Sequence, residues 1–115
     1  MIFIAKNEEG IPSWKLVLNG MKTVTRRLKP MDVDKVFAVQ PGRGKFAVCK
    51  AKVISCIACD DWYSQEIAEK GNEHLLDEEA HKEGFGSWDG LLDWLIKKYG
   101  EDLPTFYRIE FEKLC

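Results

Sequence analysis

Apolar and charged side chains alternate near the end of the chain, over residues 107–112. The apolar members are Tyr107, Ile109 and Phe111, and the charged members are Arg108, Glu110 and Glu112. A period of two predicts a β-strand that buries one face and exposes the other to water. We therefore expect the charged members of this strand, Arg108 included, to lie on the wet face.

A longer period marks the segment before that strand. Its apolar residues recur three and four positions apart, at Trp88, Leu91, Leu92, Leu95 and Tyr99. This spacing predicts a helix with one apolar stripe. Ser87 is its expected N-cap and Gly100 its expected end. Shorter helices are expected from Pro12 to Gly20, over residues 64–70 before Gly71-Asn72, and over residues 74–82 before Gly84.

Four other segments are rich in the β-branched and aromatic residues that favour strands. We expect strands at residues 2–4, 24–28 and 36–39, and either one long bent strand or two strands that share a kink over residues 45–57. With helices clustered between strands from both ends, the order predicts one α+β domain over residues 1–115, with a mixed or mostly antiparallel sheet. Glycine-rich turns would allow a small sheet of this kind to curl into a β-barrel.

The overall composition indicates only the general class of protein. The chain has 115 residues, 45% of them hydrophobic and 31% charged, as in ordinary soluble domains. No apolar run reaches the roughly 18 residues of a membrane span, and the first residues lack the basic lead of a signal peptide. We therefore expect a cytoplasmic protein that does not associate with membranes. The oligomeric state is not predicted by any of these features.

The charges are distributed unevenly. Residues 11–59 carry ten Lys and Arg against two acidic residues, whereas residues 60–115 carry six against fifteen. Such an asymmetry indicates a basic surface for phosphate-bearing partners. The alternative is that the two halves neutralise each other across the fold.

Four cysteines raise the question of a metal site: Cys49, Cys56, Cys59 and Cys115. Cys56 and Cys59 have the CxxC spacing of a zinc or redox site, and His74 and His81 could complete a set of four ligands. Their spacing matches no familiar zinc finger, and the CxxC lies in a strand-like run. We therefore expect reduced, structural cysteines, and neither a metal nor another cofactor.

The junction between the first helix and the strand at residues 24–28 carries the most distinctive chemistry. Gly20 is suited to the left-handed end of a helix, and Lys22 and Thr25 emerge directly after it. A threonine hydroxyl becomes a nucleophile when a base removes its proton, and a lysine can do so when burial or nearby cations lower its pKa. Glu83 could then pass a proton to a leaving amine. The alternative is that all three are ordinary surface or strand residues.

Arg26 and Arg27 follow Thr25 directly, so on a strand they would point to opposite faces and could not both line one pocket. We expect one to pair with a carboxylate as structural support. The other, Arg27, shares a face with Thr25 and could bind a phosphate or a base edge. Trp14, Trp62 or Trp88 could stack on a base, although tryptophans also serve as core residues.

These segments together resemble the ASCH domain, a family of the PUA-like superfamily. The resemblance rests on the four segments Leu18–Arg27, Gly44–Val48, Glu83–Phe85 and Phe106–Phe111, which occur in the family's order and span most of the chain. It implies a PUA-like β-barrel surrounded by helices, with a cleft beside the Gly-x-Lys-x-x-Thr motif. The double arginine and Glu83-Gly84-Phe85 are closer to the broad family than to its amidohydrolase members.

The resemblance also implies function. The family was proposed to bind RNA, and some members are similar to amidohydrolases that deacetylate N4-acetylcytidine, or are reported as ribonucleases. In the amidohydrolases the motif's lysine and threonine act with a glutamate, which correspond here to Lys22, Thr25 and Glu83. The interpretation is an RNA- or nucleoside-binding protein, with a metal-independent hydrolase and a non-catalytic interaction domain as alternatives. Its expected ligand-binding residues are Gly20, Thr23, Arg26, Arg27, Arg43 and Lys45.

Overall fold

A four-stranded antiparallel sheet and a group of helices make up this α+β chain, whose computed structural model describes residues 1–69, 71 and 74–114. The strands are β1 (Val24–Arg27), β2 (Val36–Val39), β3 (Cys49–Ala58) and β4 (Tyr107–Leu114). The helices are α1 (Ser13–Leu18), α2 (Cys59–Tyr63), the π-helix η1 (Ser64–Ala68), α3 (His74–Lys82) and α4 (Trp88–Tyr99). The expectations for Lys70, Asn72 and Cys115 lie outside the described residues.

The strand order is β1-β4-β3-β2, so the strand from the end of the chain lies in the middle of the sheet. In β1 and β4, Thr25 lies opposite Ile109 and Arg26 opposite Arg108. The register of β3 against β4 shifts between Val53 and Ser55, which supplies the bend expected in the long strand. Within the described residues no ladder joins β1 to β2, and the sheet is therefore open.

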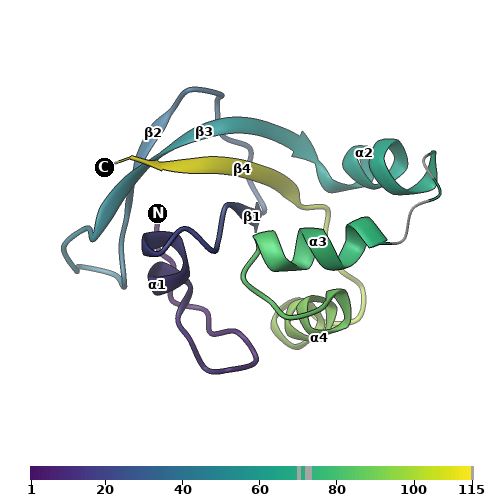
Figure 1. Cartoon of the computed structure of the whole chain (residues 1–115), viewed down its shortest axis with the longest axis horizontal. Helices are drawn as coiled ribbons and strands as arrows, with labels where there is room; N and C mark the ends of the chain where they lie inside the picture. The colour runs from purple at the N-terminus through teal and green to yellow at the C-terminus, as the bar shows by residue number, and fades with distance from the viewer. Residues whose placement is uncertain (70, 72–73, 115) are drawn as a thin grey trace.

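Helices α1, α3 and α4 lie along one side of the long strands β3 and β4, and α2 continues from the end of β3 (Figure 1). The residues expected to cap or end the helices do so. The Ser87 hydroxyl accepts a hydrogen bond from the Gly90 amide at the start of α4. Gly20, Gly84 and Gly100 follow α1, α3 and α4 with φ values of 82°, 94° and 91°, which residues with a Cβ rarely adopt.

Two groups of buried side chains hold these layers together. Under the sheet, Phe3, Phe37 and Phe111 are in mutual contact, with ring centroids 5.6–6.3 Å apart. Between α3, α4 and the start of β4, the buried residues are Ala80, Leu91, Leu95 and Phe106.

Several predicted elements differ from the structure. Residues 2–4 form no strand of the sheet, because Ile2 makes only an isolated parallel bridge to Gln40. The predicted strand at residues 45–57 begins at Cys49, since the turn before it continues further than expected. The helix predicted at residues 64–70 begins at Cys59, five residues earlier. Arg108 is buried, not solvent-exposed, because its guanidinium pairs with the carboxylate of Glu79 on α3.

A pair of phenylalanines tests where the core lies. Phe111 is 1% exposed and Phe46 is 97% exposed. Phe111→Ala should lower the free energy of unfolding by about 3–5 kcal/mol, because it leaves a cavity among aromatic rings. The matched change Phe46→Ala should stay within about 0.5 kcal/mol of wild type. Urea unfolding followed by circular dichroism measures both, and equal losses would contradict this core.

Candidate functional site

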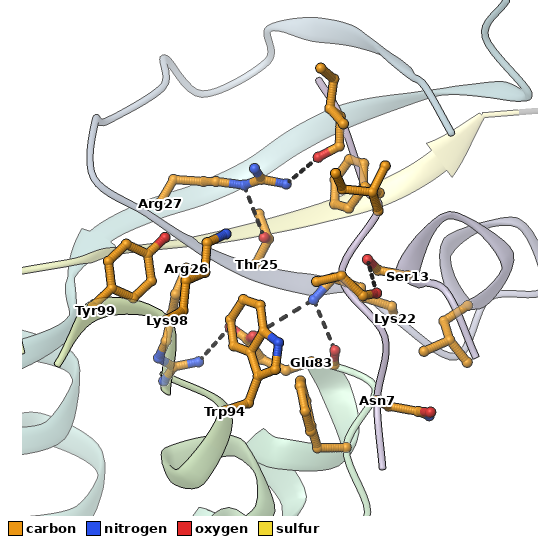
Figure 2. A pocket seen from close by; sticks show the side chains of 16 residues that line it. Asn7, Ser13, Lys22, Thr25, Arg26, Arg27, Glu83, Trp94, Lys98 and Tyr99 are labelled. Carbon is orange, nitrogen blue, oxygen red and sulfur yellow. Dashed lines mark hydrogen bonds and ion pairs between the residues drawn. The ribbon is translucent and has the colours of Figure 1, made fainter. Parts of the chain in front are cut away.

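A cavity of about 70 Å³ opens where the N-terminal segment, α1, β1 and α4 meet. Its polar lining includes Lys22, Thr25, Arg26, Arg27 and Glu83 (Figure 2). The aromatic lining comes from Phe3, Phe85, Trp94 and Tyr99. We call this space the Lys22 cavity.

The chain reversal after α1 carries Lys22 into the interior. Gly20 turns the backbone, and the Lys22 amide donates a hydrogen bond to the Leu16 carbonyl at 2.9 Å. The next amide, of Thr23, donates to the carbonyl of Lys82 at the end of α3. These two backbone hydrogen bonds attach the turn at Gly20 to α1 and α3. They fix the backbone of Lys22 independently of its side-chain contacts.

The Lys22 ammonium is 6% exposed and meets Glu83 twice. Its Nζ donates to the Glu83 main-chain carbonyl at 2.8 Å and lies 3.6 Å from the carboxylate Oε2. Burial lowers the pKa of Lys22 below its ordinary value of 10.5, and the charges of Arg27 and Arg26 lower it further against the opposing charge of Glu83. The environment therefore favours a neutral amine more than water does.

Thr25 lies on β1 and is 4% exposed. Its hydroxyl accepts a hydrogen bond from Arg27 Nε at 3.2 Å, and Arg27 Nη2 donates to the Ile2 carbonyl at 3.0 Å. The guanidinium also lies 4.8 Å from the centre of the Phe3 ring. A fixed cation thus stands beside the hydroxyl oxygen, where it can stabilise negative charge that develops on that atom or next to it.

Glu83 directly follows α3 and is 4% exposed. Arg26 Nη1 donates to its Oε1 at 2.8 Å, while Arg26 Nη2 donates to Glu79 Oε2 at 2.9 Å. Arg108 from β4 donates to both oxygens of Glu79. We call this set of four side chains the buried charge network. It joins β1, β4 and α3 and fixes the carboxylate that faces Lys22.

Aromatic rings cover the network on its other side. The guanidinium of Arg26 lies 5.4 Å from the centre of the Trp62 ring and 5.6 Å from that of Trp88. Both rings border a second cavity of about 250 Å³, which shares only Arg26 with the Lys22 cavity among the described residues. Trp62 and Trp88 therefore stabilise Arg26 by cation–π contact, and Trp14 packs against the sheet core instead.

The structure brings together five of the expected site residues and leaves four apart. Lys22, Thr25, Arg26, Arg27 and Glu83 all line the cavity. Gly20, Thr23, Arg43 and Lys45 are absent from its described lining. Gly20 acts through its conformation, and its amide is already donated to the Val17 carbonyl. Thr23 fastens the strand to α3, and Arg43 and Lys45 are exposed in the loop between β2 and β3.

The prediction that Arg26 and Arg27 could not share a pocket is wrong. Both side chains are long, and β1 is the edge strand of the sheet. Both residues therefore contribute to the lining of the Lys22 cavity. The division of roles is nonetheless as expected, since Arg26 is paired with carboxylates and Arg27 lies beside Thr25.

Sequence reasoning missed the wall of the cavity that α4 supplies. Trp94 and Lys98 lie four residues apart on that helix, with Lys98 Nζ 5.0 Å from the Trp94 ring centre. Tyr99 was assigned to the apolar stripe, yet it also lines the cavity. The available signal was Trp94 itself, a large aromatic residue that falls outside the helix's apolar stripe at a spacing that pairs it with a lysine.

The cysteines show no metal site within the described part of the chain. Cys49, Cys56 and Cys59 are free thiols, and no three His, Cys, Asp or Glu side chains of the described residues gather as metal ligands. Burial raises the pKa of Cys59 to about 11, so this thiol is a poor nucleophile near neutral pH.

Comparisons with models of known protein families, with curated proteins and with solved structures gave no match. Among residues 1–69, 71 and 74–114, no helix is long and apolar enough to cross a bilayer. A buried amine, a hydroxyl beside a guanidinium, and a fixed carboxylate are a set that can activate an alcohol for attack on an acyl group.

The buried charge network predicts a large difference between two neighbouring glutamates of α3. Glu79 is 1% exposed, and Glu78 is exposed. Glu79→Gln should cost about 3–5 kcal/mol of unfolding free energy, because it leaves two buried arginines undercompensated. Glu78→Gln should change it by less than about 0.5 kcal/mol. Urea titrations at neutral pH measure both, and a small effect at Glu79 would contradict the network.

The same network sets a pH dependence. Burial alone would raise the pKa of Glu79, but the hydrogen bonds and charges of Arg108 and Arg26 outweigh it and hold the pKa below its ordinary value of 4.5. The stabilisation is therefore complete above that ordinary value and is lost as the pH falls through the lower, folded-state pKa. The unfolding free energy should therefore fall less steeply at acidic pH in Glu79→Gln than in the wild-type protein.

Proposed function

We propose that this chain is a metal-independent amidohydrolase of the ASCH type that removes an acyl group from a modified nucleoside or from RNA that carries one. The observation that carries the proposal is the convergence of Lys22, Thr25 and Glu83 on one cavity from three separate parts of the chain. A cytoplasmic setting and a PUA-like fold, of which the open sheet would be the main part, belong to the same proposal.

The first step is attack by Thr25. Lys22 acts in this step as the neutral amine: one N–H donates to the Glu83 carbonyl, as it does in the structure, and the nitrogen lone pair accepts the Thr25 proton. The Thr25 oxygen then bonds to the amide carbon, and the carbonyl electrons move onto its oxygen. Arg27, already hydrogen-bonded to the Thr25 hydroxyl, stabilises that oxyanion.

Collapse of this intermediate breaks the carbon–nitrogen bond. The Lys22 ammonium passes its proton to the departing amine, and the Glu83 carboxylate, 3.6 Å from Nζ, stabilises the ammonium until it does. Water then hydrolyses the threonine ester. Lys22 accepts the water's proton as the water oxygen bonds to the acyl carbon, and it returns this proton to the Thr25 oxygen as the carbon–oxygen bond of the ester breaks. The products are a carboxylic acid and the free amine, and Thr25 is restored.

The size of the cavity limits which part of a substrate can enter. One water molecule needs roughly 10–15 Å³ of a cavity measured in this way, so a cavity of about 70 Å³ has room for a small acyl group rather than a whole nucleoside. Trp94 and Tyr99 border the same space and offer aromatic faces to a base that carries the acyl amide. These features support a small N-acyl group on a base as the substrate.

Removal of the proposed base should stop the chemistry. Lys22→Met should lower kcat for N4-acetylcytidine by about 10²–10⁴-fold, the usual contribution of a general base. Thr25→Val should lower it at least as much, while binding of cytidine stays nearly unchanged. Lys29→Met, at an exposed position away from the cavity, is the matched control and should keep full activity. Liquid chromatography of released cytidine measures turnover, and full activity in Thr25→Val would rule out this nucleophile.

The pH profile tests the state of Lys22. Because the neutral amine is the active form, kcat/KM should rise with pH to a plateau, with a midpoint below the ordinary lysine value of 10.5. Arg27 helps to lower the pKa of Lys22, so the residual activity of Arg27→Gln should show the same limb at higher pH. A profile that is flat, or unmoved by Arg27→Gln, would contradict the assignment of the base.

A further inference from the structure

The hairpin formed by β2, β3 and the loop between them is basic. Residues 35–58 contain five Lys and Arg and no acidic residue. We call this segment the basic hairpin. Lys52 faces Glu112 across the sheet and lies 3.8 Å from Asp34. At the loop end, Arg43, Lys45 and Lys50 are exposed, and no carboxylate of the described residues forms an ion pair with them.

The same loop presents an aromatic ring to solvent. Phe46 is 97% exposed, more than any other large hydrophobic residue described. The loop around it is held by hydrogen bonds from Lys45 N to the Gly42 carbonyl and from Gln40 Nε2 to the Lys45 carbonyl. A structured loop that holds a whole phenyl ring in water, flanked by cations, has the composition of a stacking platform for single-stranded nucleic acid.

The loop is also connected to the rim of the Lys22 cavity. Gln40 is hydrogen-bonded to the N-terminal segment, since its carbonyl accepts from the Phe3 amide and its amide donates to the Met1 carbonyl. A methyl group placed at Gly42 would lie 4.0 Å from the Ile4 side chain, and Ile4 lines the cavity. Ile4 thus lies between the loop and the reacting groups and is itself 60% exposed.

We propose that the basic hairpin binds the single-stranded RNA next to a modified base held at the Lys22 cavity, with Phe46 stacking on a flanking base and Arg43 and Lys45 contacting phosphates. This inference rests on the proposed function for the position of the modified base. It identifies the preferred substrate as a nucleotide within an RNA strand rather than a free nucleoside. Ile4 supplies the apolar bridge between the two binding positions.

The binding test uses a short fluorescein-labelled oligouridylate that carries no acyl group, with fluorescence anisotropy as the readout. Phe46→Ala should weaken binding by about 5- to 140-fold, the range expected for loss of one base–aromatic stack. The double variant Arg43→Ala/Lys45→Ala should reduce the slope of log K against log salt by about 1.4, or about 0.7 for each phosphate contact. Tyr63→Ala, another exposed aromatic, is the matched control and should bind as wild type does.

The catalytic test keeps the two proposals separate. Phe46→Ala should hydrolyse free N4-acetylcytidine at the wild-type rate and should raise KM only for an acetylated oligoribonucleotide. If the wild-type protein hydrolyses neither substrate but Phe46→Ala still loses oligouridylate binding, the catalytic proposal fails and the hairpin proposal stands. If the free nucleoside is hydrolysed and Phe46→Ala binds oligouridylate normally, the hairpin proposal is overturned.

Two other partners for the hairpin give distinct outcomes. If Phe46→Ala converts a dimer to a monomer in sedimentation without changing oligouridylate binding, the loop is an interface between copies and the RNA proposal is wrong. If Phe46→Ala abolishes binding to phosphatidylserine vesicles and leaves RNA binding intact, the proposal is overturned in favour of a lipid surface. The urea midpoint of each variant shows whether it is folded before either result is interpreted.

Discussion

The pairing of Glu79 with Arg26 and Arg108 is the interaction on which the rest of this structure depends. It brings an edge strand, the central strand and α3 to one point in the interior, where isolated charges would be prohibitively costly. Each member is compensated, and no buried side-chain nitrogen or oxygen of the described residues lacks a partner. Ion pairs of this kind add little net stability over apolar packing but demand one geometry.

That geometry explains why the pKa of the buried Lys22 amine is lowered. Arg26 binds the Glu83 carboxylate directly, so Lys22 shares that carboxylate instead of having it alone. Burial and the two neighbouring arginines then outweigh the attraction of Glu83, and the lysine pKa falls. The network thus supports the proposed chemistry indirectly. It holds the Glu83 carboxylate in place, which sets how strongly its negative charge acts on Lys22. It also fixes the position of β1, the strand that carries Thr25.

The uneven charge of the chain has two uses in the folded protein. Part of it is neutralised internally, since Arg26 from the basic half pairs with Glu79 and Glu83 from the acidic half. Part remains on the basic hairpin, where Arg43 and Lys45 form no ion pair with a carboxylate of the described residues. Neutralisation between the two halves is therefore confirmed for Arg26, whereas a phosphate-bearing partner for the remaining basic side chains stays a prediction.

The sequence by itself determined the features that depend on neighbouring residues. Apolar spacing predicted α4, and Ser87, Gly84 and Gly100 marked helix ends, because caps and turns are set by local backbone geometry. Tertiary structure alone decided the burial of Arg108, the loss of the strand at residues 2–4 and the exposure of Phe46. Each of these depends on which distant segment covers a given face, and a period along the chain carries no information about that partner.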